Sequence, residues 1–553
     1  MKLFRHRCRV FIPRVVLLTA IILWFAFYGA NAETDRSSFS NPISQAKALT
    51  ISKAVQQVPT KPSLLLAETN KSKKTERYPV RKGEAGVKNR KYQYGDVRRY
   101  GAVGDGVHDD HHALMNALNQ NKTVYLQTGK TYKCNDGFYM NNGQIIRGNN
   151  ATLLIDDDYA PQNDMGYKFL RSRWGKSGTT YEIYDLTITY DSDHTIQNFP
   201  GEFILFYPDG FEKVIMNKVT LQAVDGSSKV HLMYACSGKT IMEEVKLINN
   251  NTAISGGCLW LNNTTSRVAS IDCKNSYFYN SSSDEALAVY GSGSAQGSFV
   301  GCTFESTNEK LRKDTLPIAI YDASMTGYSG EVKAVDIEFK QCNFIERFDP
   351  DNKFVNVCYL GVGSSNFNKF ITVTLNECTM NNENPASPFG LREHYISLNG
   401  TNFISNSVIN VNQSELFLNS SIAGTYSAWV KKEAVGTTLV PSIHIKDSKI
   451  ECEYAVIDIP NTQNYPINAS IDSCKIQIRN AISLVKAVYR VPLAISIMNN
   501  TITADQTLKK FTSVYGETHK TIPLNATEKI SIKNNVLNKK KLKDLEIHRD
   551  LNQ

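Results

Sequence analysis

Ile471-Asp472-Ser473-Cys474-Lys475-Ile476 is one copy of the six-residue signature that decides the fold of this chain. Each copy has an apolar residue, two mostly polar residues, a small or apolar residue at the fourth position, a spacer and a second apolar residue. Twelve copies are predicted between residues 183 and 537, with 26 to 41 residues between successive centres. The fourth positions are Leu186, Val219, Val245, Ser276, Cys302, Cys342, Cys378, Ser407, Ser448, Cys474, Asn500 and Asn535.

A repeat of this length is typical of one winding of a solenoid, with loops of different lengths inserted in some windings. Apolar residues on either side of a short polar turn indicate strand, turn and strand, and stacking on neighbouring windings buries their apolar face. A leucine-rich or helical repeat is disfavoured, because no sustained 3.6-residue periodicity separates the copies. We therefore predict an all-β chain, a right-handed parallel β-helix of about 12 or more coils over residues 94–538.

Residues 1–32 have the features of a secretory signal peptide: a basic start, a continuous apolar stretch over 15–30 and the small-x-small pattern Ala30-Asn31-Ala32. The apolar stretch is shorter than the ~20 residues of a membrane-spanning helix. Cleavage is therefore favoured over an uncleaved signal anchor, and only such an anchor would attach the chain to a membrane. We expect a protein that is secreted or lies in the periplasm or cell envelope.

Residues 33–93 are predicted to form a disordered basic stem, since they have few aromatic residues and no periodicity. The chain has a net charge of +9; residues 1–32 contribute +5 and residues 33–99 contribute +9, which leaves −5 for residues 100–553. An acidic body argues against nucleic acid as a partner. At the other end, residues 539–553 are predicted to be either a short capping helix or a frayed tail.

Ten cysteines follow the predicted signal peptide, and an even number in an exported protein is compatible with disulfides. However, Cys302, Cys342 and Cys378 share the fourth position of the signature, where a small apolar side chain stacks well on the next winding. No CxxC pair is present, which disfavours a zinc site. We predict mostly buried, unpaired thiols.

The segment GAVGDGVHDDHHAL, residues 101–114, precedes the repeats. Its glycines predict turns, and an Asp followed by apolar Leu114, Ala117 and Leu118 predicts a short helix that covers the open edge of the first winding. In this setting the acidic residues are expected to be structural and the histidines to be solvated rather than metal ligands. These residues are Asp105, Asp109 and Asp110, with His108, His111 and His112.

This segment, together with VYLQTGKTY at 124–132, resembles the entry motif of the pectate-lyase superfamily of right-handed β-helix proteins. That superfamily includes polysaccharide lyases, polygalacturonase-like hydrolases, uronate epimerases and phage tailspikes. The resemblance covers residues from about 94 to 160 by motif and the rest of the body by repeat pattern. It implies the fold and a polysaccharide partner, but not one reaction, because the motif builds the cap and not an active site. Trimers are common among such proteins, so a homotrimer is a further expectation.

A second apolar strand recurs between the signatures, and alternation places Trp260, Tyr290, Tyr321 and Tyr359 on its outward side. Neighbouring windings lie roughly 5 Å apart. Aromatic side chains in one strip suit the apolar faces of sugar rings, and ordinary packing under loops is the alternative.

Loops that lead into these strands are rich in charge over four consecutive windings, and stacking is expected to bring them to one rim. Two carboxylates can hydrolyse a glycosidic bond. A base can instead remove the proton α to a uronate carboxylate, often with a cation such as Ca²⁺, so Ca²⁺ is expected only for a lyase. No metal ligands are assigned. The catalytic candidates are Asp284, Glu285, Asp314, Arg392, Glu393 and His394, and Lys313 is a substrate-binding candidate.

The stretch SDEALAV at 283–289 resembles the acid-pair strand of polygalacturonases, and Asp284 and Glu285 match that family's paired aspartates. The preceding winding lacks a third carboxylate, and the following windings have no Gly-His-Gly or Arg-x-Lys signature. No segment reproduces the Asp-Pro-His-Asp motif of alginate epimerases. These departures weigh against the polygalacturonase reaction, whereas the location of the site is what the resemblance implies.

Two classes of function remain. The first is an exported polysaccharide-active enzyme, a lyase or hydrolase acting on an acidic polysaccharide. The alternative is a non-catalytic carbohydrate-binding or exopolysaccharide assembly or export protein, which the missing catalytic signatures favour. A phage tailspike is disfavoured by the predicted signal peptide.

Overall fold

The structure is a computed structural model. The predicted signal peptide and most of the predicted stem lie outside the residues that it describes, and within them no helix is long and apolar enough to cross a membrane. The described residues are 77–159, 168–172, 180–191, 203–208, 211–224, 230–236, 238–250, 256–263, 268–281, 285–291, 294–307, 318–322, 333–347, 358–364, 369–382, 387–391, 406–418, 423–425, 442–452, 456–459, 467–479, 483–488, 493–504, 510–515, 529–537 and 540–541.

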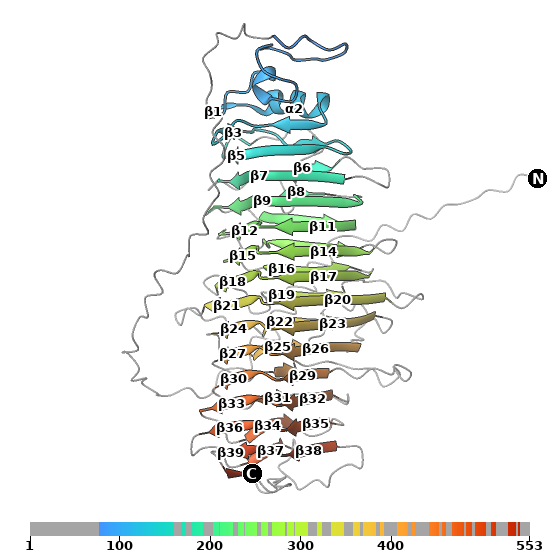
Figure 1. Ribbon diagram of the computed structural model, residues 1–553, viewed down its shortest axis with the longest axis vertical. Helices are drawn as coiled ribbons and strands as arrows, with labels where there is room; N and C mark the ends of the chain where they lie inside the picture. Colours follow the sequence, from blue (N-terminus) through green and yellow to red (C-terminus); the bar gives the residue numbers. More distant parts are fainter. Residues whose placement is uncertain are drawn as a thin grey trace, which may run out of the picture. The chain divides into compact units, whose positions relative to one another are not determined.

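The body is a right-handed parallel β-helix, as the repeat predicts (Figure 1). A typical winding contributes one strand to each of three stacks, and each strand pairs in parallel with its equivalent in the next winding. In the early windings, single long strands serve the first and second stacks together. These long strands are β5 (Ile145–Ile155), β7 (Thr180–Tyr190) and β9 (Lys213–Ala223).

The strands of the first stack precede the short turn of each winding. They are β11 (Gly238–Glu243), β14 (Ala269–Lys274), β17 (Ala295–Val300), β20 (Lys333–Lys340), β23 (Lys369–Asn376), β26 (Asn406–Asn412), β29 (Ser442–Lys446), β32 (Ile467–Asp472), β35 (Leu493–Met498) and β38 (Lys529–Lys533).

The strands of the second stack follow the short turn. They are β12 (Lys246–Asn249), β15 (Tyr277–Asn280), β18 (Thr303–Thr307), β21 (Asn343–Arg347), β24 (Thr379–Asn382), β27 (Glu415–Leu418), β30 (Lys449–Cys452), β33 (Lys475–Ile478), β36 (Thr501–Ala504) and β39 (Val536–Leu537), and β40 (Lys540–Lys541) pairs antiparallel with β39.

The third stack is a separate 13-stranded parallel sheet. Its strands are β4 (Phe138–Met140), β6 (Lys168–Ser172), β8 (Phe203–Tyr207), β10 (Val230–Cys236), β13 (Leu259–Asn263), β16 (Leu287–Gly291), β19 (Ile318–Asp322), β22 (Cys358–Ser364), β25 (Ser387–Leu391), β28 (Ala423–Thr425), β31 (Ile457–Ile459), β34 (Ser483–Val488) and β37 (Lys510–Tyr515).

The N-terminal end is closed by the predicted helix, α2 (His111–Gln120), which buries Leu114, Ala117 and Leu118 (Figure 1). Asp110 is buried and accepts hydrogen bonds from the backbone N–H groups of Val103 and Gly104, so it is structural as expected. The other cap elements are η1 (Val97–Tyr100), β1 (Asp105–Asp109), β2 (Thr123–Tyr125) and β3 (Thr131–Lys133).

The prediction that the histidines of the cap are solvated is wrong for one of them. His111 is not solvated: it is 7% exposed, and its ring stacks on Phe138 of β4 with 4.9 Å between centroids. Burial of the ring lowers its pKa. The prediction failed because Phe138 belongs to the first winding of the third stack, which the local sequence around the helix does not reveal.

The ordered body also begins earlier than residue 94. The side chain of Glu84 is 1% exposed and accepts two hydrogen bonds of 2.9 Å from the guanidinium of Arg99, which itself is 0% exposed. Arg99 also donates to the carbonyl oxygen of Pro79. Residues 77–93 are therefore packed on the cap, and the predicted stem boundary at residue 93 is too late. The buried guanidinium requires a buried partner, and Glu84 supplies it.

The short turn explains the signature. In each winding the residue before the fourth position has a positive φ, as in Asn275 (49°), Glu377 (54°) and Asp447 (51°). A left-handed backbone disfavours β-branched residues and favours short polar ones, which accounts for the polar third position. The left-handed residue turns the chain from its strand in the first stack into its strand in the second stack.

One of the twelve predicted copies is wrong. The turn between β26 and β27 is centred on Ser414, not Ser407, because the left-handed residue is Gln413 (φ 49°) and its N–H donates to the Lys446 carbonyl, as the equivalent residues of other windings do. Val411 and Leu416 are the flanking apolar residues. Here "turn column" means the corrected fourth positions, all buried: Leu186, Val219, Val245, Ser276, Cys302, Cys342, Cys378, Ser414, Ser448, Cys474, Asn500 and Asn535.

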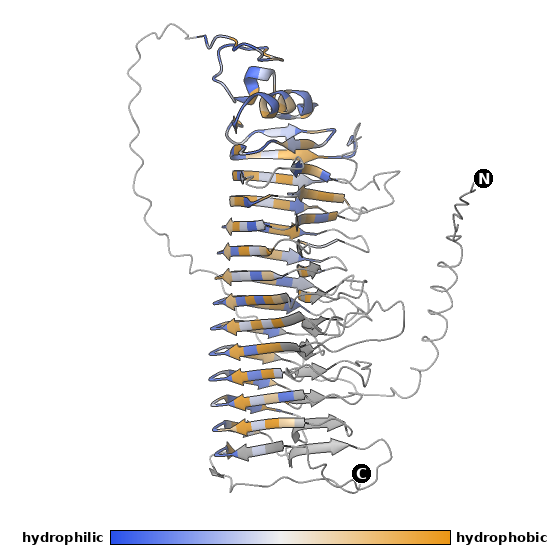
Figure 2. Cartoon of the chain, turned by 90° about the vertical axis from the view of Figure 1, so that its right-hand side faces the viewer, coloured by the Kyte–Doolittle hydropathy of each residue, from blue (hydrophilic) through white to orange (hydrophobic). Residues whose placement is uncertain are grey.

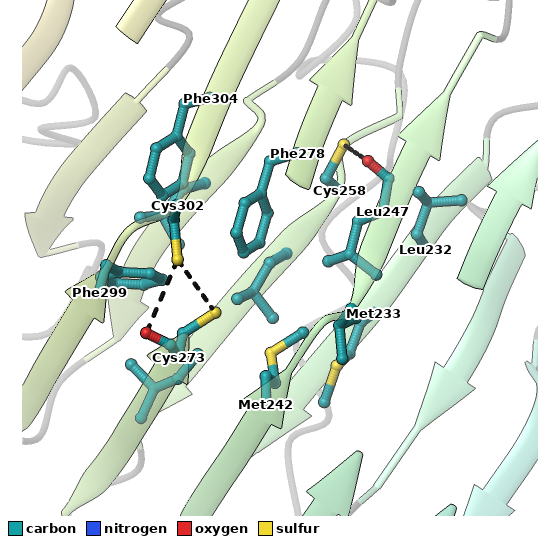
Figure 3. Packing of buried hydrophobic residues seen from close by; sticks show 14 of the residues in the cluster. Leu232, Met233, Met242, Leu247, Cys258, Cys273, Phe278, Phe299, Cys302 and Phe304 are labelled. Carbon is teal, nitrogen blue, oxygen red and sulfur yellow. Dashed lines mark hydrogen bonds between the residues drawn. The ribbon is translucent and has the colours of Figure 1, made fainter. Parts of the chain in front are cut away.

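The interior of the stack is one apolar cluster, and apolar and polar residues alternate along the strands (Figure 2). Thiols belong to this interior: the Cys302 thiol lies 3.7 Å from the sulfur of Cys273, and Cys258 contacts the Leu247 carbonyl (Figure 3). Burial raises the pKa of Cys452 to about 12, so this thiol stays protonated at neutral pH. Eight cysteines of the described residues are buried thiols: Cys134, Cys258, Cys273, Cys302, Cys342, Cys378, Cys452 and Cys474.

Candidate functional site

The third stack positions the only predicted site residues whose side chains are described, Trp260 and Glu285. Both are partly exposed. For Tyr290, Tyr321 and Tyr359 the structure describes the strand position and not the side chain. The other predicted site residues lie outside the described residues: Asp284, Lys313, Asp314, Arg392, Glu393 and His394.

The register of the third stack aligns one residue of every winding with Trp260. We call this set the outer row. Before Trp260 the row carries large side chains; after it come five windings with Ala or Gly, followed by Asp, Lys and Ser. Its members are Tyr139, Arg171, Tyr207, Tyr234, Trp260, Ala288, Ala319, Gly361, Gly390, Gly424, Asp458, Lys486 and Ser513.

The register divides the predicted aromatic strip into different rows. Tyr290 pairs with Asn262, two residues beyond Trp260, whereas Trp260 itself pairs with Ala288. Tyr321 pairs with Gly363 and therefore lies in the row of Tyr290. Tyr359 immediately precedes Leu360, the partner of Ile318, and so belongs to neither of these rows. Alternation along a strand does not show which residues of neighbouring windings stack.

Three consecutive windings of the outer row carry a continuous set of aromatic rings, which we call the aromatic ladder: Tyr207, Tyr234 and Trp260. The ring centroids of Tyr207 and Tyr234 are 5.7 Å apart, and those of Tyr234 and Trp260 are 5.5 Å apart. Their planes are tilted by 35° and 42°, and all three side chains are partly exposed. Each winding therefore offers part of an aromatic surface at the spacing of the strands.

Trp260 ends the ladder beside the imidazole of His231. Its ring lies 4.6 Å from the ring of His231, which is fully buried and accepts a 3.1 Å hydrogen bond at Nδ1 from the N–H of Gly257. A neutral His231 therefore carries its proton on Nε2. A Cβ at Gly257 would lie 2.9 Å from Trp260 Nε1 and 2.6 Å from the Glu285 carbonyl oxygen, so only glycine lets these residues approach so closely.

Two cations accompany the other end of the row. Lys168 Nζ lies 4.3 Å above the ring of Tyr207, and the guanidinium of Arg171 lies 5.7 Å from the ring centre of Tyr139. Such cation–π contacts stabilise a positive charge most strongly when the charge is removed from water.

Sequence reasoning missed His231, Tyr139, Arg171, Tyr207 and Tyr234. The signal was present for the four missed members of the row, since each directly follows an apolar residue, as in Phe206-Tyr207 and Met233-Tyr234.

The first stack carries a different hollow, a shallow polar groove of about 600 Å³. Its lining includes the ion pair of Lys239 with Asp272, at 2.6 Å, and Glu338, which accepts a hydrogen bond from Asn376. The groove has no aromatic lining residue. Within the described part of the chain, no group of three or more His, Cys, Asp or Glu side chains is placed to hold a metal ion.

Comparisons with known proteins find similarity only to solved structures of low sequence identity. No protein-family model matches the chain, and a search of curated proteins finds no match. The surface adhesin PfbA of Streptococcus pneumoniae is similar, with 13% identity over 76% of this chain and 92% of that one and a TM-score of 0.45. The family 28 exopolygalacturonase of Yersinia enterocolitica has 10% identity, with 75% and 78% covered and a TM-score of 0.42.

The catalytic unit of a GH87 alpha-1,3-glucanase from Streptomyces thermodiastaticus is also similar, with 13% identity, 80% and 68% covered and a TM-score of 0.38. At such identities the likeness concerns the fold, so an assignment of function has to come from this chain's own residues.

Proposed function

We propose that this chain is an exported polysaccharide-active protein that binds an acidic glycan along the outer row of the third stack. The observation that supports the proposal most is the aromatic ladder of Tyr207, Tyr234 and Trp260, partly exposed in three consecutive windings. Aromatic side chains with one polar end are suited to sugar rings, whose faces are apolar and whose edges carry hydroxyls. Strands about 4.8 Å apart place one ring beside each successive sugar.

Cleavage is the second part of the proposal. In the sequence, Asp284 and Glu285 come shortly before β16, the strand that pairs with the strand of Trp260. We therefore expect a glycan bound on the ladder to reach them beyond Trp260. As a hydrolase, one carboxylic acid would protonate the leaving glycosidic oxygen while water supplies the new hydroxyl. As a lyase, a base would take the proton α to the uronate carboxylate, and the leaving oxygen would depart with formation of a C=C bond and no uptake of water.

The alternative is a protein that binds the glycan without cleaving it. One observation favours it: the windings that follow β16 have no Gly-His-Gly or Arg-x-Lys signature. Under this alternative the ladder would have the same role, and the rim would contribute affinity only.

The ladder is tested by Trp260→Ala, with Tyr279→Ala as the matched control, because Tyr279 is a partly exposed tyrosine on β15 of the second stack. Affinity for a panel of acidic polysaccharides, measured by affinity electrophoresis, is expected to fall at least about tenfold for Trp260→Ala and to stay unchanged for the control. Unchanged affinity of a folded Trp260→Ala protein for every polymer that the native protein binds would disprove the site.

Cleavage is tested with Asp284→Asn and Glu285→Gln in the same panel. Unsaturated products absorbing in the ultraviolet indicate a lyase, and reducing ends without that absorbance indicate hydrolysis. Loss of product formation with retained binding supports the catalytic assignment. Binding without any shortening of the glycan by the native protein selects the non-catalytic alternative.

A further inference from the structure

The outer row contains one arginine among its aromatic residues. Arg171 pairs with Tyr139 on one side and with Tyr207 on the other, so its position is equivalent to a rung of the ladder. The residue is 9% exposed. A guanidinium carries five N–H donors that cannot lose their charge, so burying one without acceptors is costly.

Within the described part of the chain, the side chain of Arg171 makes no hydrogen bond and no ion pair, and its Nε is buried without a partner. The other deeply buried arginine, Arg99, is the opposite case, since it is held by Glu84 and by backbone carbonyls. The contact of Arg171 with the Tyr139 ring at 5.7 Å compensates only part of the lost hydration. The fold therefore retains a buried cation without an anion from the described residues.

We propose that Arg171 is the carboxylate-binding point of the outer row, receiving the carboxylate of a uronic acid residue whose ring packs against the neighbouring tyrosines. This inference rests on the proposed function and adds to it a site two windings before the ladder's centre. A planar guanidinium matches a carboxylate through two parallel hydrogen bonds, which a lysine cannot reproduce. Lys168, above the ring of Tyr207, adds positive charge at the same end of the row.

The test compares Arg171→Gln and Arg171→Lys with the control Arg147→Gln. Arg147 is a matched control because its guanidinium also lies over a tyrosine, 3.8 Å from the Tyr184 ring centre, but on the long strands β5 and β7. The probes are polygalacturonate, alginate and hyaluronan, each paired with its esterified, uncharged form. Arg171→Gln is expected to weaken binding of the acidic member about tenfold or more, and of the esterified member less than about twofold. Arg171→Lys should recover only part of the loss.

A second measurement does not depend on which polymer is the natural one. Sodium glucuronate should raise the Tm of the native protein relative to equal sodium chloride, and should not do so for Arg171→Gln. Equal shifts in both proteins, or equal weakening of acidic and esterified polymers by Arg171→Gln, would overturn the site. Failure of Trp260→Ala to weaken any polymer would instead refute the ladder, and the glucuronate result would then stand separately.

Discussion

The turn column and the outer row each contain one residue from every winding, aligned by the same parallel strand pairing. They differ in what their side chains contact. In the turn column the contacts stay inside the protein: Ser448 Oγ accepts from the N–H of Ser414, and Asn500 Oδ1 accepts from the N–H of Cys474. In the outer row the large side chains remain partly exposed, and Arg171 keeps a buried charge without a described partner.

This difference separates residues that hold the fold from residues that are available for a ligand. The turn column carries only apolar residues, Cys, Ser and Asn, because each side chain has to fit between windings. Where the residue is Ser or Asn, its side-chain oxygen also accepts from the N–H of the winding before. The outer row changes from aromatic to Ala and Gly within one winding, between Trp260 and Ala288, although the strand geometry is unchanged. The change coincides with a change in burial, since Trp260 is partly exposed and Ala288 is fully buried.

Both rows depend on the cap that closes the stack, so the largest effect is expected at Glu84. The Arg99 guanidinium lowers the pKa of Glu84 to about 2 from 4.5. Its contribution to stability is therefore complete above pH 4.5 and is lost as the pH falls through about 2. Glu84→Gln should lower the free energy of unfolding by about 3 kcal/mol at pH 7, and the difference from the native protein should shrink between pH 4.5 and 2. Urea unfolding at several pH values measures it, and a difference independent of pH would contradict the assignment.

Asn500→Ala should have the next largest effect. It leaves the N–H of Cys474 and the carbonyl of Ile471 without their partners, at 2.8 and 3.0 Å, inside the stack. We expect a loss of roughly 2 to 3 kcal/mol of unfolding free energy, without a change in glycan affinity. The control is Asn499→Gly, one residue earlier at φ 57° and on the surface, which should change stability by less than about 0.5 kcal/mol. Equal losses in the two variants would refute the difference between buried and exposed turn positions.

Ala288→Phe tests why the aromatic part of the outer row stops. Ala288 is 0% exposed although it aligns with the partly exposed Trp260, so a large side chain should overfill this winding at a cost of about 2 kcal/mol. Gln296→Phe, at an exposed position of β17, is the control and should be nearly neutral. If Ala288→Phe kept full stability and bound glycan more tightly, the small half of the row would be an open surface instead.

The stacks could be predicted from the sequence because inward residues must be apolar in every winding, and eleven of the twelve predicted turn positions are confirmed. The exception shows the limit: Ile404, Ser407 and Ile409 satisfy the same pattern as Val411, Ser414 and Leu416, and only the left-handed Gln413 with its pairing selects the second set. The outer row was harder to predict. A register error of a few residues changes which outward side chains stack, and the loops between strands vary in length, so Trp260 was grouped with Tyr290 rather than with Tyr234.

The smallest effect is expected for Cys378→Ser. Serine already occupies the turn column in the next two windings, and Ser414 Oγ both accepts from the N–H of Cys378 and donates to the carbonyl of Asn412. Serine at 378 can form the equivalent bonds, so the free energy of unfolding should change by less than about 1 kcal/mol. Cys378→Val, which fills the position but cannot accept a hydrogen bond from the winding before it, should cost more than Cys378→Ser in the same urea titration. If valine were the better replacement, the turn column would be held by apolar packing alone, and its contrast with the outer row would be one of exposure rather than of hydrogen bonding.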